Sequence, residues 1–136
     1  MKEKYKEILD EVGDEIDSSL RDSKGLVFHQ RRLAFSLSLG IVTLIEVYLD
    51  SLKVLKPGAK VNHLWLKKKK ENVKELISKQ ISCPIENLKE TEEMLDVAYE
   101  IERERNELAY GKRASEELLK SKINLFLNLR NKLKDV

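Results

Sequence analysis

The stretch LAFSLSLGIVTLIEVYL, residues 33–49, is the most apolar part of this chain of 136 residues. Glu46 is its only charged residue. The stretch is shorter than the roughly 20 residues that a bilayer-spanning helix needs. A helix that is apolar on most sides lies at the centre of a protein. We therefore predict that these residues form the core helix of a protein without a membrane span.

Apolar residues on both sides of this stretch recur every three or four positions, which predicts further helices. Pro57-Gly58, Pro84 and Gly111 interrupt the pattern, and Asn62 and Ser115 are suitable helix caps. The predicted helices cover residues 3–22, 26–55, 63–80, 86–110 and 115–133. Short loops between them favour an all-α fold, an antiparallel up-and-down bundle of four to five helices. We expect a single domain over residues 1–136.

The single cysteine and the charged first 20 residues lead us to expect a cytoplasmic protein. Cys83 is the only cysteine, which excludes an internal disulfide framework and fits a reducing compartment. We expect it to be a small, wholly or partly buried thiol. The first 20 residues are charged throughout and show no secretory pattern.

Charge is segregated along the chain. Residues 60–80 carry seven basic and two acidic groups, residues 86–107 three basic and nine acidic, and residues 112–134 seven basic and two acidic. Two interpretations follow from this pattern. The segments could pair with one another inside the fold, or they could present a basic face to an anionic partner.

The sequence predicts no metal site and no cofactor. The five glycines are scattered singly, so no phosphate-binding loop is present. His29 and His63 lie far apart, and no Cys/His/Asp cluster has zinc-ligand spacing. Glu46 is the isolated charge of the apolar stretch and would be costly to bury alone. We expect it to pair with an Arg or Lys, or to face a cavity.

The run KKKK, residues 67–70, follows Trp65 closely. Lys67, Lys68, Lys69 and Lys70 could neutralise RNA phosphates while Trp65 stacks on a base. The alternative is a solvated helix face, because four consecutive helix residues point in four directions.

The segment RERNELAYGK, residues 103–112, supplies the candidate catalytic residues Arg105, Asn106 and Tyr110. Asn106 and Tyr110 are four residues apart and share a helix face, about 40° from each other. Arg105 lies about 140° from Tyr110 by the same geometry. Arg105 and Tyr110 therefore converge only if the helix breaks, if the arginine side chain curls over, or if a second subunit contributes.

The sequence RNELAYG resembles the R-N-x-x-x-H-G signature of HEPN domains, all-α proteins that include RNase toxins paired with minimal nucleotidyltransferases. The apolar helix with Glu46, the NHL triplet at 62–64 and the segment SEELLKSKINLFLNL at 115–129 resemble other parts of that family. The resemblance implies that Arg105 holds the scissile phosphate and that Asn106 orients the site. It also implies a homodimer with both motifs lining one cleft, and metal-independent RNA cleavage in which the 2′-hydroxyl attacks the adjacent phosphate.

Two departures from the signature separate the functional alternatives. Tyr110 replaces the histidine, and Lys112 stands where the toxin branch often has a modifiable tyrosine. Tyrosine, with a pKa near 10, is protonated at neutral pH, so Tyr110 would donate a proton unless cations lower its pKa.

The leading prediction is an RNA-binding, HEPN-like protein, extended to a metal-independent endoribonuclease of toxin–antitoxin type. The alternative is a non-catalytic HEPN dimerisation module that binds a nucleotidyltransferase antitoxin. A small-molecule-binding bundle would require an enclosed pocket near Glu46.

Overall fold

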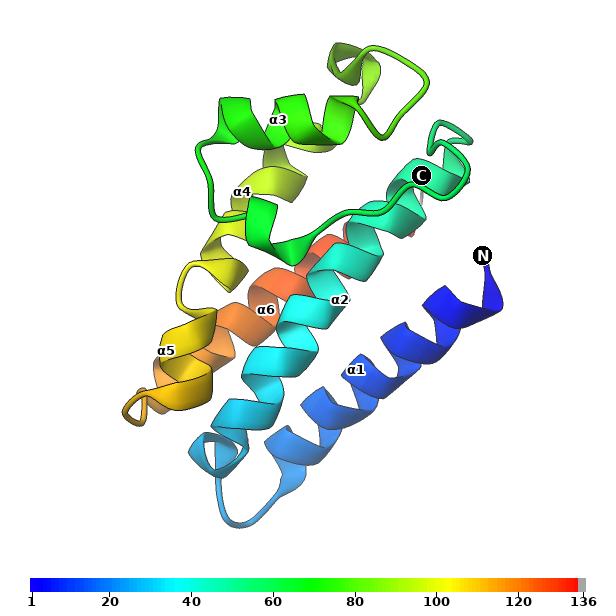
Figure 1. The fold of residues 1–136 in the computed structure, drawn as a ribbon. Helices are drawn as coiled ribbons and strands as arrows, with labels where there is room; N and C mark the ends of the chain where they lie inside the picture. The colour runs from blue at the N-terminus through cyan, green and yellow to red at the C-terminus, as the bar shows by residue number, and fades with distance from the viewer. Residues whose placement is uncertain (135–136) are drawn as a thin grey trace.

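The computed structural model describes residues 1–134 and consists of helices packed side by side (Figure 1). Within these residues there is no β-strand, only an isolated antiparallel bridge between Leu55 and Ile81. The all-α fold that the sequence predicts is therefore confirmed. The elements are α1 (Glu3–Arg21), η1 (Leu26–His29), α2 (Gln30–Ser51), η2 (His63–Trp65), α3 (Lys70–Ser78), η3 (Ile85–Asn87), α4 (Thr91–Glu102), α5 (Arg105–Tyr110) and α6 (Glu116–Leu133), where η denotes a 3-10 turn.

The predicted core stretch lies in α2, and α2 is the central helix. It contacts α1, α4, α5 and α6 (Figure 1). Leu33, Ile41, Ile45 and Leu49 are completely buried in it. Burying a side chain of this size contributes about 1.5–3 kcal/mol, so this helix makes a large contribution to the core.

The segment Leu26–Ser51 is long and apolar enough, by length and composition, to cross a membrane. In the structure, 61% of its most apolar window is buried against other parts of the chain. The core helices of soluble proteins have the same length and composition, and α2 is packed as such a helix.

The predicted third helix begins later than expected. Residues 63–65 form the 3-10 turn η2, and α3 starts only at Lys70. Asn62 caps the turn by accepting a hydrogen bond from the backbone N–H of Leu64, at 2.9 Å. Val61 and Leu66 are both buried, although one continuous helix would separate them by about 140°. The bend allows both side chains to reach the core.

The predicted fourth helix, residues 86–110, is also interrupted. Its first residues form η3, α4 ends at Glu102, and α5 begins at Arg105 after a turn at residues 103–104. α5 ends at Tyr110, so Gly111 is the stop that the sequence predicts. A Cβ at position 111 would lie 2.6 Å from the carbonyl oxygen of Glu107, which explains the glycine.

The segregated charges pair inside the fold. Lys70 of α3 binds Glu92 at 2.8 Å and Asp96 at 2.6 Å, and Lys74 also binds Glu92. From the other side, Lys132 of α6 binds Glu90 and Glu93 of α4. The acidic helix is thus flanked by two basic ones, and the first interpretation of the charge pattern is confirmed.

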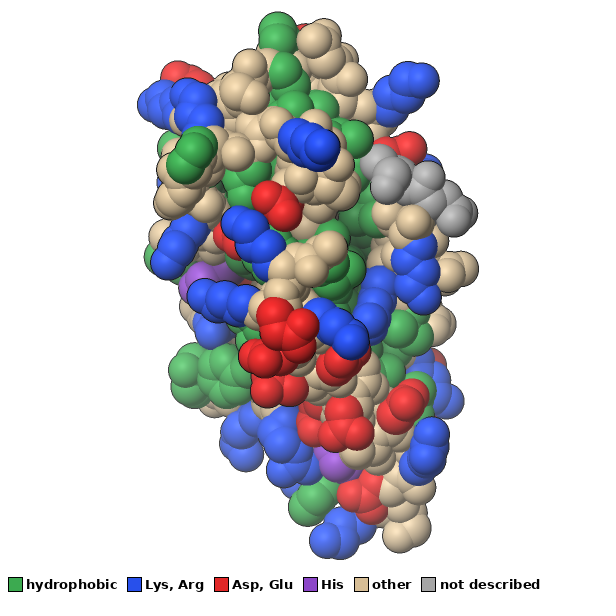
Figure 2. Space-filling view, turned by 90° about the vertical axis from the view of Figure 1, so that its right-hand side faces the viewer, with side chains coloured by type: hydrophobic (Ala, Val, Ile, Leu, Met, Phe, Trp, Pro, Cys, Tyr) green, Lys and Arg blue, Asp and Glu red, His purple; other side chains and the backbone are tan. Residues whose placement is uncertain are grey.

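The face that carries α1 is not uniformly basic. Figure 2 shows acidic side chains gathered along its middle, with Lys and Arg side chains around them. On this side the molecule therefore offers an anionic partner little attraction.

Gly40 of α2 lies close against both α1 and α6. A Cβ at this position would lie 2.6 Å from the ring of Phe126 in α6 and 3.1 Å from Val12 in α1. Both neighbours are buried, so neither can move away easily.

We predict that Gly40→Ala lowers the free energy of unfolding by about 1–3 kcal/mol through overpacking. Gly13→Ala is the matched control. Its Cβ would meet only a guanidinium nitrogen of Arg130, at 3.4 Å. It should raise the free energy of unfolding by about 0.5–1 kcal/mol, because alanine is the better helix former. Urea denaturation of both variants measures the difference, and equal effects would show that helix propensity outweighs packing at residue 40.

Candidate functional site

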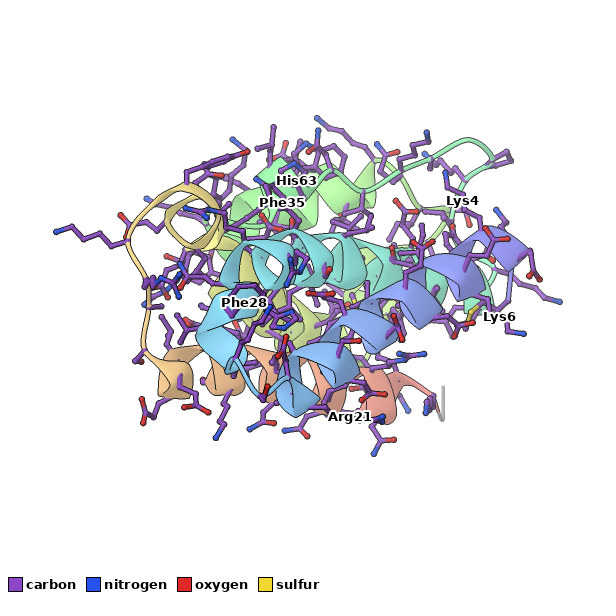
Figure 3. All side chains as sticks on the ribbon, turned by 90° about the horizontal axis from the view of Figure 1, so that it is seen from below. Lys4, Lys6, Arg21, Phe28, Phe35 and His63 are labelled. Atoms are coloured by element: carbon purple, nitrogen blue, oxygen red, sulfur yellow. The ribbon has the colours of Figure 1, made fainter. Side chains whose placement is uncertain are left out.

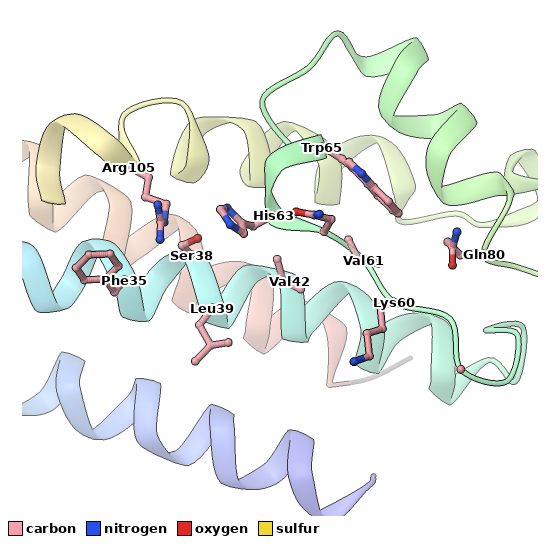
Figure 4. Close-up of a pocket in the computed structure, with 12 residues that line it drawn as sticks. Phe35, Ser38, Leu39, Val42, Lys60, Val61, His63, Trp65, Gln80 and Arg105 are labelled. Atoms are coloured by element: carbon pink, nitrogen blue, oxygen red, sulfur yellow. The ribbon is translucent and has the colours of Figure 1, made fainter. Parts of the chain in front are cut away.

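A cleft of about 660 Å³ opens between α2, the loop before η2, η2 itself and the start of α5 (Figure 4). Polar and aromatic side chains from all of these segments line it. They include Phe35, Ser38, Asn62, His63, Trp65 and Arg105. Figure 3 shows that Phe35 and His63 lie on the same side of the molecule.

Arg105 is the first residue of α5, and its side chain points into this cleft. Its guanidinium carbon lies 5.0 Å from the centre of the Phe35 ring, a cation–π contact. One terminal nitrogen donates a hydrogen bond to Oδ1 of Asn106, at 3.1 Å. Its Nε is buried without a hydrogen-bond partner in the described part of the chain. The guanidinium is therefore positioned, but its hydrogen-bonding capacity is not fully used.

Tyr110 does not line the cleft. Its side chain is 73% exposed, and its ring meets the ring of Phe35 edge-on, with the centroids 6.0 Å apart. Arg105 lines the cleft and Tyr110 does not, although both side chains contact the ring of Phe35. Phe35 of α2 therefore links the two side chains. The angle between them that helix geometry gives stays a prediction.

Two side chains at the start of α2 hold α5 in place. A helix of six residues is too short to be stable alone. The Gln30 amide donates hydrogen bonds to the carbonyl oxygens of Leu108 and Lys112, and its oxygen accepts one from the N–H of Ala114. Arg31 donates to the carbonyl of Ala109. These carbonyls at the end of α5 would otherwise lack partners.

Lys122 of α6 fixes the turn between α4 and α5. Its side chain is only 3% exposed, and its Nζ donates to the carbonyl oxygen of Glu100 at 2.5 Å. The same ammonium binds a carboxylate oxygen of Glu104 at 3.0 Å. That hydrogen bond lowers the pKa of Glu104, with further contributions from the charges of Lys122 and Arg103. The direction in which Arg105 leaves the turn therefore depends on an ion pair between the buried Lys122 and the partly exposed Glu104.

The sequence analysis missed a group of polar residues at the cleft, in which Ser38 and His63 line the cleft and Glu102 lies buried behind them. Glu102, at the end of α4, is 2% exposed. One carboxylate oxygen accepts a hydrogen bond from the Ser38 hydroxyl, and the other lies 3.3 Å from Nδ1 of His63. Glu102 stands four and seven residues after the buried Ala98 and Leu95. The sequence could have indicated Glu102, because its carboxylate lies on the apolar face of a predicted helix.

Glu46 faces a cavity, which is the second of the two expected environments. It lines a hollow of about 430 Å³ between α1, α2 and the loop around Pro57-Gly58. Its carboxylate accepts a hydrogen bond from the backbone N–H of Val61, at 2.8 Å, and within residues 1–134 no ion pair to an Arg or Lys is found. Burial raises the pKa of Tyr5, and the nearby charges of Glu46 and Asp50 raise it further. Glu46 ties the loop before His63 to α2.

The tetralysine run and Trp65 do not form one patch. Trp65 lines the cleft with Arg105, whereas Lys67, Lys68, Lys69 and Lys70 line a separate hollow beside α4. Hydrogen bonds to Asp96 and Glu92 raise the pKa of Lys70 and neutralise its charge within the fold. Lys67 to Lys69 are exposed to solvent, as the alternative of a solvated face predicts, but they precede α3 and do not lie on a helix face.

His29 and Cys83 have structural environments. His29 is buried, with Nε2 2.8 Å from Asp22 and Nδ1 near Glu15 and Arg32. Cys83 is a free thiol that is partly buried, as predicted, and packs against the core. No group of three His, Cys, Asp or Glu side chains within residues 1–134 is arranged to hold a metal ion.

Comparison with protein-family models, with curated proteins and with solved structures finds no match for this chain. The HEPN resemblance therefore depends on the motif residues alone and stays a prediction.

We predict that Gln30→Ala lowers the free energy of unfolding by about 2–3 kcal/mol, because it leaves buried backbone groups without partners. Gln80→Ala is the matched control. Gln80 is partly exposed, with no side-chain hydrogen bond in the described chain, and should change stability by less than about 0.5 kcal/mol. Chemical denaturation measures both, and equal losses would contradict the clamping role of Gln30.

The pair of Glu104 and Lys122 predicts an acid-sensitive component of stability. Because the folded state lowers the pKa of Glu104 below its ordinary 4.5, the pair stabilises the fold above that value. Its contribution is lost as the pH falls through the lowered pKa. The stability difference between the wild type and Glu104→Gln should be largest near about pH 6 and shrink towards about pH 3. Denaturation at a series of pH values tests this, and a constant difference would refute it.

Proposed function

We propose that this protein is an RNA-binding, HEPN-like domain and that the cleft around Arg105 holds the RNA. The observation that carries the proposal is the Arg105 guanidinium, placed in the cleft by Phe35 and Asn106. A guanidinium offers several N–H donors in the planar arrangement that suits phosphate oxygens.

Other residues of the cleft suit the remaining parts of a nucleotide. Trp65 offers an aromatic face, and stacking on such a face contributes about 1–3 kcal/mol for each base. Lys60 lines the same cleft and adds a second positive charge. Lys67, Lys68 and Lys69 follow Trp65 in the sequence but line a separate hollow, so they would contact only a strand long enough to leave the cleft.

We extend the proposal to metal-independent cleavage of the bound RNA. Arg105 would stabilise the negative charge that develops on the phosphate during attack by the 2′-hydroxyl. Asn106 orients the guanidinium through its hydrogen bond. Tyr110 stands at the rim beside Phe35, where its hydroxyl can contact RNA or donate a proton. In a homodimer the tyrosine of the second subunit could complete the cleft.

A second candidate function is a HEPN-type interaction module. Phe28 of η1 and Phe35 and Leu39 of α2 are 41–46% exposed, and they are spaced seven and four residues apart along the chain. An exposed apolar row of this kind often marks a contact with another protein chain. The partner would be a second copy of this chain or a nucleotidyltransferase-type antitoxin.

Arg105→Ala should weaken binding of a fluorescently labelled single-stranded RNA at least about tenfold, a loss of about 1.4 kcal/mol. Trp65→Ala should weaken it by a similar factor. Arg103→Ala is the matched control, because Arg103 is an exposed arginine two residues away, paired with Glu100 and Glu104 outside the cleft. It should bind nearly as the wild type does.

Fluorescence anisotropy at fixed salt measures these affinities. Equal loss in Arg103→Ala and Arg105→Ala would contradict the cleft and indicate a general charge effect. A wild type that does not bind RNA, but co-purifies with the product of the adjacent gene, would favour the interaction module.

A further inference from the structure

The group formed by His63, Glu102 and Ser38 has no role in the binding scheme above. We propose that His63 is the proton-transfer residue of the cleft and that Glu102 is its positioning residue. This inference rests on the proposed RNA cleavage and names the residue that replaces the histidine missing from the motif.

The first observation is the fixed position of the Glu102 carboxylate. It is buried at the end of α4, and the buried Ser38 of α2 donates a hydrogen bond to one of its oxygens. Burying a carboxylate costs several kcal/mol unless its oxygens find partners. Within residues 1–134 its hydrogen-bond partners are Ser38 and His63. An apolar residue would fill this position at lower cost, so the carboxylate points to a functional role.

The second observation is the orientation of His63. Its Nδ1 faces the Glu102 carboxylate at 3.3 Å, and a carboxylate can only accept, so this contact is a hydrogen bond in the tautomer that carries its proton on Nδ1. The other ring nitrogen, Nε2, is then left as the acceptor. The side chain is 36% exposed and lines the cleft, where Figure 4 shows it beside Arg105. A ring nitrogen that accepts protons therefore lies next to the guanidinium that would hold the phosphate.

The loop around His63 is fixed from both sides. Asn62 caps the turn that contains the histidine, and the preceding residue, Val61, is bound to Glu46 of α2. An imidazole held on a fixed turn by a fixed carboxylate keeps one orientation, which proton transfer requires.

His29 shows what a structural histidine looks like in the same protein. It also lies beside carboxylates, but it is buried, and both of its ring nitrogens face Asp22, Glu15 or Arg32. For His63 no partner of Nε2 is found within residues 1–134. Of the two histidines, only His63 therefore has a ring nitrogen that is available to a substrate.

The imidazole of His63 alone accounts for both proton transfers of the cleavage reaction. Nε2 of His63 takes the proton of the ribose 2′-hydroxyl as the 2′-oxygen forms a bond to the adjacent phosphorus. Arg105 stabilises the charge on the non-bridging oxygens. As the bond between phosphorus and the 5′-oxygen breaks, the imidazolium gives its proton to that oxygen. The products are a 2′,3′-cyclic phosphate and a 5′-hydroxyl end, and His63 returns to its starting state.

This step defines the substrate class. The nucleotide on the 5′ side of the cleaved bond must carry a 2′-hydroxyl, so RNA is cleaved and DNA is not. An RNA with one 2′-deoxyribose at the cleavage position should bind with nearly unchanged affinity and remain intact at that position.

The experiment measures binding and cleavage separately for the wild type, His63→Ala, His63→Gln and Glu102→Gln. His63→Ala should bind RNA within about twofold of the wild type and cleave it at least about 100-fold more slowly. Added imidazole should restore part of the rate to His63→Ala. Glu102→Gln should lower kcat more than it raises KM and should shift the pH–rate profile. Leu64→Ala, an exposed neighbour outside the cleft, is the control and should cleave as the wild type does.

The outcomes separate this inference from the proposed function. Cleavage by folded His63→Ala or His63→Gln at the wild-type rate would overturn the role of His63 and leave the RNase proposal standing. A wild type that binds RNA but does not cleave it would overturn the inference and leave only RNA binding. A wild type that neither binds nor cleaves RNA would overturn both. If His63→Ala does not fold, His63→Gln decides, because its amide can keep the hydrogen bond to Glu102.

Discussion

The packing of α2 is the constraint on which the rest of the structure depends. α1, α4, α5 and α6 all contact this helix, and its buried residues face them, while Phe35 and Leu39 lie on its exposed side. Such packing brings α2 and α6 close together at Gly40, which leaves room for the ring of Phe126 because it has no side chain. The first turn of α2 also caps α5, while its middle supplies Phe35 and Ser38 to the cleft. Core and candidate site are therefore built on the same helix.

Buried polar side chains locate the site within this apolar frame. Gln30 holds the end of α5, Lys122 holds the turn before it, and Glu102 holds His63. Each is costly to bury, and each is satisfied by a specific partner rather than by water. Apolar packing alone would allow a six-residue helix such as α5 to slide or unwind. The polar contacts fix its register, and the orientation of Arg105 follows from it.

Many charged side chains of α3, α4 and α6 pair with one another within the fold. The lysines of α3 and α6 neutralise the carboxylates of α4, although exposed pairs of this kind contribute only about 0–1 kcal/mol each. This pairing removes Lys70, Lys74 and Lys132 from any basic surface. Arg105 and Lys60 in the cleft, together with Lys67 to Lys69 nearby, are then the cations placed to meet an anionic ligand.

The sequence by itself determined the all-α class, the amphipathic faces of the helices, the central position of residues 33–49 and the stop at Gly111. These features depend on local periodicity and on backbone preferences, which neighbouring residues already contain. α2 ends at Ser51, before the predicted stop at Pro57-Gly58. The sequence also predicted an angular separation of Arg105 and Tyr110 from local helix geometry, but only the tertiary structure brought both side chains onto the ring of Phe35. Only the tertiary structure decided that the chain bends at residues 103–104, since that turn depends on Lys122, which lies 18 residues further on. The meeting of Ser38, His63, Glu102 and Arg105 was likewise beyond the sequence, because four segments distant along the chain come together only when α2 is packed.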